Sequence, residues 1–314
     1  MKQEIYIRDL SKEWLEHKEL VVKYSTIARY ESIVECHLKD MDIDKPISCW
    51  KEKDYEKWYY TFTLNSELSK STHNIICIVL KDILNFAIKR YGFQKYDLSF
   101  MTKVKEKKKI NTLTTSEYQQ LSAYCKTYMN PATVSIYISL HTGLRIGEIC
   151  GLKWEDIHLE NQVLFVNKTV QRIKNRDPNG SKTIKMICTP KSPSSSRVVV
   201  LANFLIDYLK VYKSIVQPKT EDCFLITNST NIPEERNIQR NFKKICNKLN
   251  ISLTFHGLRH TFATNCVECA IDIKTLSELL GHSNTAITMD LYVHPSLSYK
   301  KEQINKISKF GVVD

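Results

Sequence analysis

The chain has 314 residues, enough for two domains of ordinary size. Hydrophobic residues make up 42% and aromatic residues 10% of it, which suffices for packed cores and excludes a disordered, collagen-like or coiled-coil protein. No apolar run approaches the roughly 18 residues of a membrane helix, and the amino terminus lacks the layout of a signal peptide. We therefore expect a cytoplasmic protein with no membrane segment.

The charge of the chain points toward a polyanionic partner. A total of 46 Lys and Arg against 34 Asp and Glu gives a net charge of +12. The excess is spread over the chain, with 21 basic and 17 acidic residues up to residue 110 and 25 and 17 after it. This distribution is typical of a protein that binds nucleic acid with all of its parts, and a merely basic protein is the alternative.

The ten cysteines are scattered irregularly, which favours reduced and mostly buried thiols over a disulfide framework. Cys266 and Cys269 form the one C-x-x-C pair, and no second pair follows at zinc-finger spacing. We expect structural packing at this pair and no bound metal.

The first hundred residues have a helical pattern. Apolar residues recur at helical spacing from Ile27 to Leu38, with Ser25 as a candidate cap, and a second helix is expected from about Ser71 to Gly92. A basic linker follows, in which five lysines fall in seven residues: Lys103, Lys105, Lys107, Lys108 and Lys109. These lysines either follow a phosphate backbone or are simply solvated.

A capping box at Thr114-x-x-Glu117 predicts the start of a second domain. A helix from Pro131 ends at a break near Gly143, and apolar runs at 163–166, 184–188 and 197–201 predict strands. We expect these strands to form one small antiparallel sheet with Lys191 at a hairpin, followed by further helices. The predicted domains are residues 1–108 and 109–314, with a carboxy-terminal tail from about 295.

Two motifs combine arginine with a turn or a helix face. In His141-Thr-Gly-Leu-Arg145, the arginine stands at a helix start, where backbone N–H groups also face an anion, and Glu148 at i+3 could hold its guanidinium. In His256-Gly-Leu-Arg259, a spacing of three puts a proton donor or acceptor beside a fixed cation.

Two further motifs add a histidine and a tyrosine. In Leu-Leu-Gly-His282 a helix stops at glycine directly before the histidine, and Tyr292 follows ten residues later. Alone, each residue has an ordinary structural explanation. Together, two arginines, a lysine, two histidines and a tyrosine, without an acidic cluster for a metal pair, suit metal-free phosphodiester transfer.

In these motifs the sequence resembles the tyrosine recombinases of the phage integrase family. Their active site takes an arginine from T-G-L-R-x-x-E, a hairpin lysine, an H-x-x-R pair, an L-G-H histidine and a terminal tyrosine, in that chain order. The matching residues here are Arg145, Lys191, His256, Arg259, His282 and Tyr292. Lys182 and Lys185 are the other candidates for the lysine, and Gly257 stands where an acidic residue is common.

The resemblance implies a mainly α fold, with a helical, SAM-like core-binding domain before a mixed α+β catalytic domain that contains a small antiparallel sheet. It implies that Tyr292 attacks a DNA phosphate, with His256 as base. Arg145, Arg259 and His282 would stabilise the developing charge, and Lys191 would protonate the leaving oxygen. No cofactor, metal or ATP is implied, and the sequence has no G-x-x-x-x-G-K-[ST] loop.

The partners that the resemblance implies are double-stranded DNA, a homotetramer on synapsed sites, and accessory DNA-bending or directionality proteins. A nucleoid-associated location follows, and we expect no extra arm-binding domain at the amino terminus. Integration or excision of a mobile element is the preferred role. A Xer-like resolvase, a DNA invertase and a catalytically silent DNA-binding regulator stay open as alternative functions, whereas a metal-dependent nuclease would need an acidic cluster.

The amphipathic tail after Pro295 is expected to dock on a neighbouring protomer, or else to fold back on its own domain.

Overall fold

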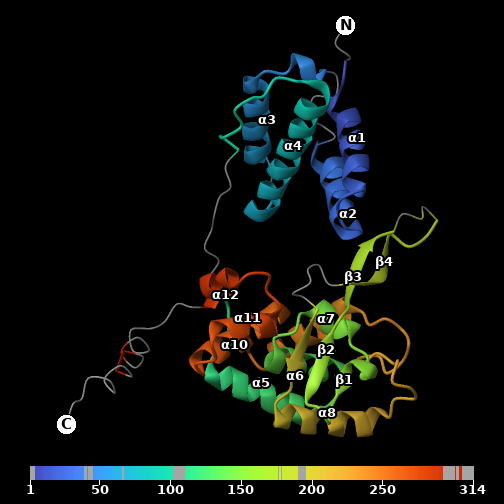
Figure 1. Ribbon diagram of the computed structural model, residues 1–314, viewed down its shortest axis with the longest axis vertical. Coiled ribbons are helices and arrows are strands. Elements are labelled where there is room, and N and C mark those ends of the chain that lie inside the picture. Colours follow the sequence, from blue (N-terminus) through green and yellow to red (C-terminus); the bar gives the residue numbers. More distant parts are fainter. Residues whose placement is uncertain are drawn as a thin grey trace. The chain divides into compact units, whose positions relative to one another are not determined.

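The computed structural model describes residues 4–38, 41, 45–65, 67–101, 110–175, 177, 179–189, 196–292, 301 and 304–305. It divides into two compact units, Met1–Lys108 and Lys109–Asp314 (Figure 1). The five linker lysines, Lys103 to Lys109, lie outside the described residues. Their contact with DNA therefore stays a prediction.

The first unit is helical throughout its described part. Ser69 caps its longest helix by accepting a hydrogen bond from the Thr72 N–H, and Gly92 ends that helix in the left-handed conformation. Ser25 is not the cap we expected, because it lies inside a helix that Lys23 precedes. The elements are α1 (Ile7–Glu19), α2 (Tyr24–Ile33), the π-helical η1 (Val34–Leu38), the 3-10 turn η2 (Ile47–Cys49), α3 (Glu52–Asn65) and α4 (Lys70–Tyr91).

Helix α4 has 22 residues and, by length and composition alone, could cross a membrane. The sequence analysis expected no apolar segment long enough to span a membrane, so α4 differs from that expectation. Seven of its residues, among them Ile76, Leu80 and Ile83, are buried in the core of the first unit with side chains such as Trp14 and Tyr55. We interpret it as the central core helix of this unit.

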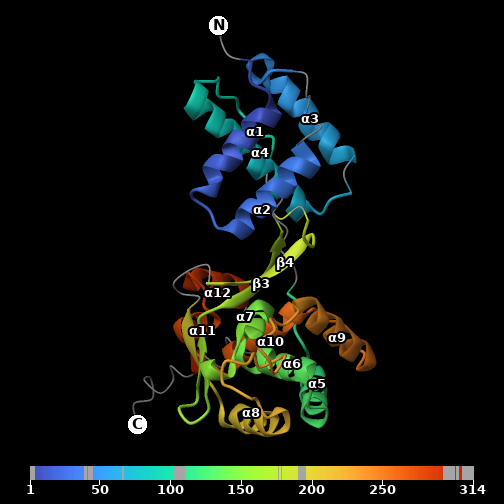
Figure 2. The same cartoon turned by 90° about the vertical axis from the view of Figure 1, so that its right-hand side faces the viewer.

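The second unit is built around a helix that is buried on nearly every side. Helix α6 is capped by Asn130, and α5, α7, α8, α9 and α10 pack against it (Figure 2). The capping box of Thr114 and Glu117 is present at the start of α5, as predicted. The helices are α5 (Thr115–Thr127), α6 (Pro131–Thr142), α7 (Ile146–Gly151), the 3-10 turn η3 (Trp154–Asp156), α8 (Asn203–Val216), α9 (Glu235–Lys248), α10 (Phe255–Glu268), α11 (Ile273–Leu280) and α12 (Thr285–Tyr292).

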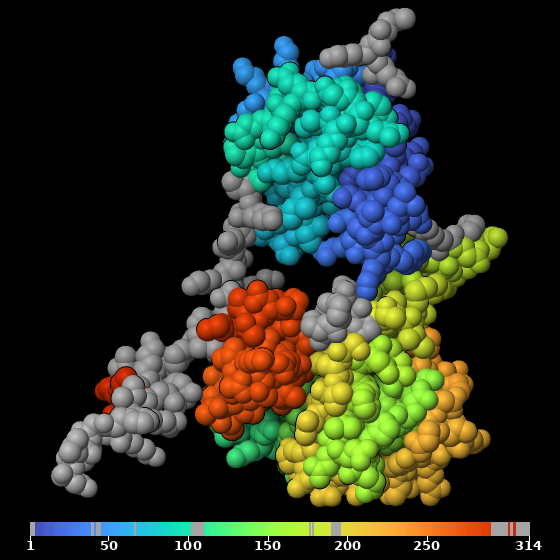
Figure 3. Space-filling view, viewed as in Figure 1, coloured from blue at the N-terminus to red at the C-terminus, as the bar shows by residue number. Residues whose placement is uncertain are grey.

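A small separate core joins the last helices of the second unit. Ala263 and Cys266 of α10 are buried there with Leu276 and Leu280 of α11. In the space-filling view this part forms the orange to red lobe beside the yellow-green strands (Figure 3). Cys266 of the C-x-x-C pair thus serves in packing.

The strands form two antiparallel sheets, so the expectation of a single sheet is wrong. One sheet has the order β1 (Ile157–His158), β2 (Val163–Val166), β5 (Arg197–Val200), and the other pairs β3 (Thr169–Lys174) with β4 (Thr183–Cys188). Strand β3 escaped the sequence analysis because only Val170 and Ile173 of its six residues are buried. The β3–β4 hairpin extends from the body of the unit (Figure 1).

The two-sheet arrangement changes the interpretation of Lys191. This residue lies between β4 and β5, which belong to different sheets, so it does not connect two paired strands as expected. Lys191 itself is outside the part of the chain that the structure describes. Its role stays a prediction.

Candidate active site

Arg145 is the N-cap of α7, and the carboxylate of Glu148, three residues later, accepts hydrogen bonds from it. Its backbone N–H donates to Glu148 Oε2 over 3.0 Å, and its Nη1 donates to Glu148 Oε1 over 2.8 Å. The Arg145 side chain is 38% exposed, whereas that of Glu148 is 6% exposed. A buried carboxylate therefore holds one edge of a guanidinium whose remainder faces solvent, where it can meet an anion.

Glu148 stays ionised in spite of its burial. Burial raises its pKa, but hydrogen bonds and charge from Arg197, together with the charge of Arg145, outweigh that effect and hold the pKa below its usual value. The charged carboxylate is what binds the arginines.

Arg259 lies one turn along α10 from His256 and is 2% exposed. Its Nη1 donates to the carbonyl of Gly143 over 2.7 Å, and its Nη2 donates to that of Leu280 over 2.6 Å. Arg259 thus ties the segment before Arg145 to the end of α11. Contact of its guanidinium with a phosphate stays a prediction.

His282 directly follows the glycine that ends α11. Gly281 has a φ of 64°, and the His282 backbone N–H donates to Ser277 O over 3.1 Å. The Nδ1 atom of His282 lies 2.8 Å from the hydroxyl of Thr288, which is fully buried on α12. The backbone of His282 is therefore held by α11 and its ring by α12.

Both predicted histidines are neutral at pH 7. For His256, desolvation at the cleft wall and the charges of His260, Arg259 and Arg145 lower the pKa to about 4. For His282, burial and the charges of Arg259, Arg145 and Arg197 lower the pKa to about 4 as well. The His256 and His260 rings meet edge to face with centroids 4.7 Å apart. A neutral imidazole can accept a proton, as a base must.

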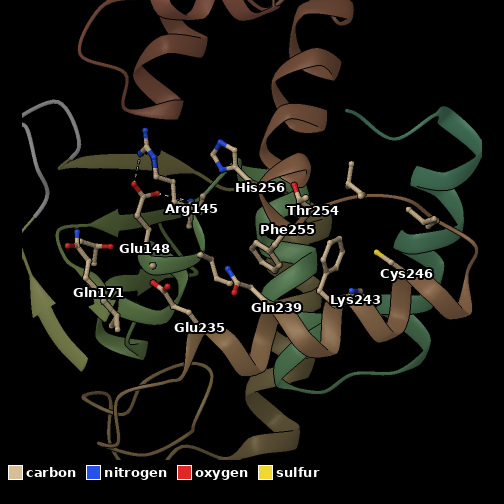
Figure 4. Close-up of a pocket in the computed structure, with 18 of the residues that line it drawn as sticks. Arg145, Glu148, Gln171, Glu235, Gln239, Lys243, Cys246, Thr254, Phe255 and His256 are labelled. Atoms are coloured by element: carbon tan, nitrogen blue, oxygen red, sulfur yellow. Dashed lines mark hydrogen bonds and ion pairs between the residues drawn. The ribbon is translucent and has the colours of Figure 1, made fainter. Parts of the chain in front are cut away.

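The structure brings four of the six predicted residues together. Arg145 Nη1 lies 3.5 Å from the same Leu280 carbonyl that Arg259 binds, and His282 follows two residues later. A cleft of about 1500 Å³ is lined by Arg145, His256 and His282 and by polar and apolar residues of α9, among them Gln239 and Phe242. In Figure 4, Arg145 and His256 point to the same side from the starts of α7 and α10.

The remaining two predicted residues are placed only by the backbone or not at all. Tyr292 is the last residue of α12, and its side chain is outside what the structure describes, as is Lys191. Of the other lysine candidates, Lys185 of β4 donates from Nζ to the carbonyl of Ile232. Among the described residues, no group of three His, Cys, Asp or Glu side chains could hold a metal ion.

The sequence analysis missed Arg197. This residue starts β5, its side chain is 6% exposed, and its Nη1 and Nη2 donate to the two oxygens of Glu148 over 3.2 and 3.0 Å. In the sequence it appears only as the polar first residue of the apolar run Val198–Leu201, 49 positions from Glu148. No local pattern distinguishes it.

Comparison with known proteins gives matches over both units. A family model described as the phage integrase family matches residues 111–298. A XerC-like tyrosine recombinase of Caldanaerobacter subterraneus is 29% identical over 93% of this chain and 80% of its own length. The transposase of transposon Tn916 from Enterococcus faecalis is 27% identical over 63% of this chain. This chain spans only 51% of that transposase.

Solved structures show the same fold. The integrase of transposon Tn1549, in complex with a circular intermediate DNA, aligns with a TM-score of 0.75 at 21% identity, covering 96% of this chain and 99% of that one. The lambda integrase tetramer bound to a Holliday junction aligns with a TM-score of 0.67 at 16% identity, covering 92% and 78%. The predicted fold class, mainly helical with a mixed α+β second unit, is confirmed, with two small antiparallel sheets in place of the one expected.

Proposed function

The chain belongs to the phage integrase family, the tyrosine recombinases, and on this premise we propose that it cleaves and rejoins DNA at specific sites through a bond between Tyr292 and a 3' phosphate. The main support for the proposal is that the guanidinium groups of Arg145 and Arg259 both lie at the Leu280 carbonyl, two residues before His282. Two cations and a neutral imidazole beside an open cleft are the groups that stabilise phosphodiester transfer without a metal.

In the proposed reaction, the Tyr292 oxygen attacks phosphorus and the bond from phosphorus to the 5' oxygen breaks. A phenol has a pKa of about 10 and is a poor nucleophile at pH 7, so a base must take its proton. Neutral His256 accepts that proton, and Lys191 gives one to the leaving 5' oxygen. Attack by another 5' hydroxyl reverses these steps and rejoins the strand.

The charge that builds on the phosphate oxygens meets donors on two sides. Arg145 presents the exposed part of its guanidinium, while His282 donates from the ring nitrogen that faces away from Thr288. Arg259, whose guanidinium is held by the carbonyls of Gly143 and Leu280, supplies a second positive charge beside that of Arg145. Because the phosphotyrosine bond conserves the energy of the phosphodiester, the proposed reaction requires no ATP. It requires no metal because the arginine and histidine side chains stabilise the charge on the phosphate.

We propose double-stranded DNA as the partner, bound by both units, and a homotetramer on paired sites as the active assembly. The DNA in the Tn1549 integrase complexes and the lambda integrase tetramer support this arrangement. Integration or excision of a mobile element is the preferred role, which the Tn916 and Tn1549 relatives support. The XerC-like relative supports a resolvase as the alternative. Such a protein acts in the cytoplasm at the nucleoid, with accessory DNA-bending or directionality proteins.

The proposal is tested with a duplex selected by the purified protein from a random pool and nicked near the cleavage site, so that cleaved strands are trapped. The wild-type protein should form a covalent protein–DNA band on a denaturing gel. Tyr292→Phe should bind the duplex with unchanged affinity and form no such band, because only the hydroxyl is lost. Tyr299→Phe is the matched control. A band with Tyr292→Phe, or none with the wild type, contradicts the proposal.

The same assay separates the two competing functions. A DNA-binding regulator would bind the duplex and leave both strands intact. A metal-dependent nuclease would cleave only until EDTA removes its metal, and added magnesium would restore it. We expect cleavage by this chain to survive EDTA, because arginine and histidine side chains replace the metal.

A further inference from the structure

All three nitrogen atoms of the Arg197 guanidinium donate to partners that belong to the candidate active site. Nη1 and Nη2 bind the carboxylate of Glu148, and Nε donates to the carbonyl of Leu279 over 2.7 Å. Its side chain is 6% exposed, and each of its three guanidinium nitrogens is directed at a protein oxygen. Whatever Arg197 does for DNA cleavage, it does through the residues that it holds.

The first partner controls Arg145. Glu148 receives the backbone N–H and Nη1 of Arg145 on the same two oxygens that bind Arg197. Two arginines therefore share one buried carboxylate. The buried Arg197 fixes the Glu148 carboxylate, which in turn orients the more exposed Arg145. Without Arg197, a 6% exposed carboxylate would lose half of its charged partners and would turn toward Arg145 or take a proton.

The second partner controls His282. The last carbonyls of α11 are capped by arginine side chains: Leu279 O by Arg197, and Leu280 O by Arg259 and, at 3.5 Å, Arg145. Only Gly281 separates these carbonyls from His282. Arg197 thus anchors both the group that orients Arg145 and the helix end from which His282 projects.

We propose that Arg197 is a positioning residue for DNA cleavage, which holds Arg145 and His282 in the geometry that binds the phosphate. This inference rests on the proposed function. A lysine could not replace it, because a single ammonium cannot donate in parallel to a carboxylate and sideways to a carbonyl as the rigid guanidinium does. Misplacement of a catalytic group by 1 Å can cost about a hundredfold in rate.

The test compares Arg197→Gln, Arg197→Lys, Glu148→Gln and the double variant Arg197→Gln/Glu148→Gln in single-turnover cleavage and in DNA binding. We expect Arg197→Gln to slow cleavage about 10- to 100-fold with the dissociation constant for DNA within about twofold, and Arg197→Lys not to restore the rate. In the Glu148→Gln background, Arg197→Gln should reduce the cleavage rate by a smaller factor than it does alone, because the carboxylate that Arg197 binds is already absent. Lys213→Gln, which removes an equal charge from an exposed salt bridge on α8, is the control.

A spectroscopic measurement makes the result independent of activity. In a protein with 13C-labelled glutamate, the Glu148 carboxyl signal, assigned by its absence in Glu148→Gln, should titrate at a higher pH in Arg197→Gln than in the wild type. If Arg197→Gln unfolds, cleavage and the Glu148 titration are both measured in Arg197→Lys instead. A wild-type protein that fails to cleave would refute the proposed function, and the Glu148 titration would still show whether Arg197 holds the carboxylate.

Three results would overturn the inference. The first is full cleavage activity in Arg197→Gln, and the second is an unchanged Glu148 titration. The third is a loss of activity that is equally large with and without Glu148 and comes with weaker, less salt-dependent DNA binding, which would indicate a direct phosphate contact.

Discussion

The hydroxyl of Thr288 lies 2.8 Å from Nδ1 of His282. Thr288 is fully buried on α12, four residues before Tyr292, so the same helix turn links the imidazole to the predicted nucleophile. With Thr288 donating to Nδ1, the ring proton lies on Nε2, where the neutral histidine can donate to a phosphate oxygen.

Thr288→Val keeps the shape of the side chain and removes this hydrogen bond. We expect cleavage to slow about tenfold, because the ring loses its preferred tautomer, and the free energy of unfolding to fall by about 1 kcal/mol. Single-turnover cleavage and denaturant unfolding measure the two effects. Thr285→Val, at an exposed position at the start of α12, is the control and should change neither. Equal cleavage by the two variants would contradict the role of Thr288.

Gly143 offers a test of the turn before Arg145. Its φ is 67°, and an added Cβ would lie 2.6 Å from Phe262 Cδ1 and 2.8 Å from Leu280 Cδ2. Gly92 has the same φ of 67° but nothing within 4 Å of an added Cβ. Gly92→Ala should therefore cost only the backbone strain, about 1–2 kcal/mol.

Gly143→Ala should cost more stability than Gly92→Ala, because the clash is added to the strain. It should also slow cleavage, since the Gly143 carbonyl binds Arg259. Thermal unfolding and single-turnover cleavage of the two variants give the comparison. A Gly143→Ala protein as stable and active as Gly92→Ala would show that the turn is not tightly packed.

His141 makes stability depend on pH. Its Nδ1 lies 2.9 Å from the Tyr118 hydroxyl, and burial, with the charge of Lys126, lowers its pKa to about 4. Its ordinary pKa is 6.5. Between these values the unfolded chain binds a proton that the folded chain does not, so the stability that is full above pH 6.5 is lost as pH falls toward 4.

We expect the free energy of unfolding to fall over this range by at most about 1.4 kcal/mol per pH unit for each such histidine, His282 included. In urea titrations at several pH values, His141→Gln should show a shallower fall than the wild type. His158→Gln, at an exposed position, should keep the wild-type slope. If His141→Gln leaves the pH dependence of the free energy of unfolding unchanged, groups other than His141 cause the loss of stability in acid.

Removal of the residues after Pro295 tests the tail. Of these residues the structure describes only Lys301, Ile304 and Asn305, with Ile304 60% exposed. We expect truncation to spare DNA binding and to impair assembly on paired sites, since burial of each large apolar side chain contributes about 1.5–3 kcal/mol. Native gels with paired duplexes measure assembly. Unchanged tetramers would favour a tail that folds back on its own domain.

Local features of the second unit could be predicted from the sequence. The Thr114–Glu117 capping box and the helix end at Gly143 are present as expected. Each depends on residues within one turn of each other, whose backbone hydrogen bonds and left-handed glycine leave a readable pattern. The chain order of the candidate residues was readable for the same reason, since each motif is local.

Tertiary structure alone decided how these motifs meet. Strand β3 is mostly polar and exists because β4 pairs with it, so its residues carry little periodic signal. Arg197 contacts Glu148 from 49 residues away, and Arg259 contacts the Gly143 carbonyl from 116 residues away. A buried charge is tolerated only where folding supplies its partners, and partners that distant leave no spacing pattern in the sequence.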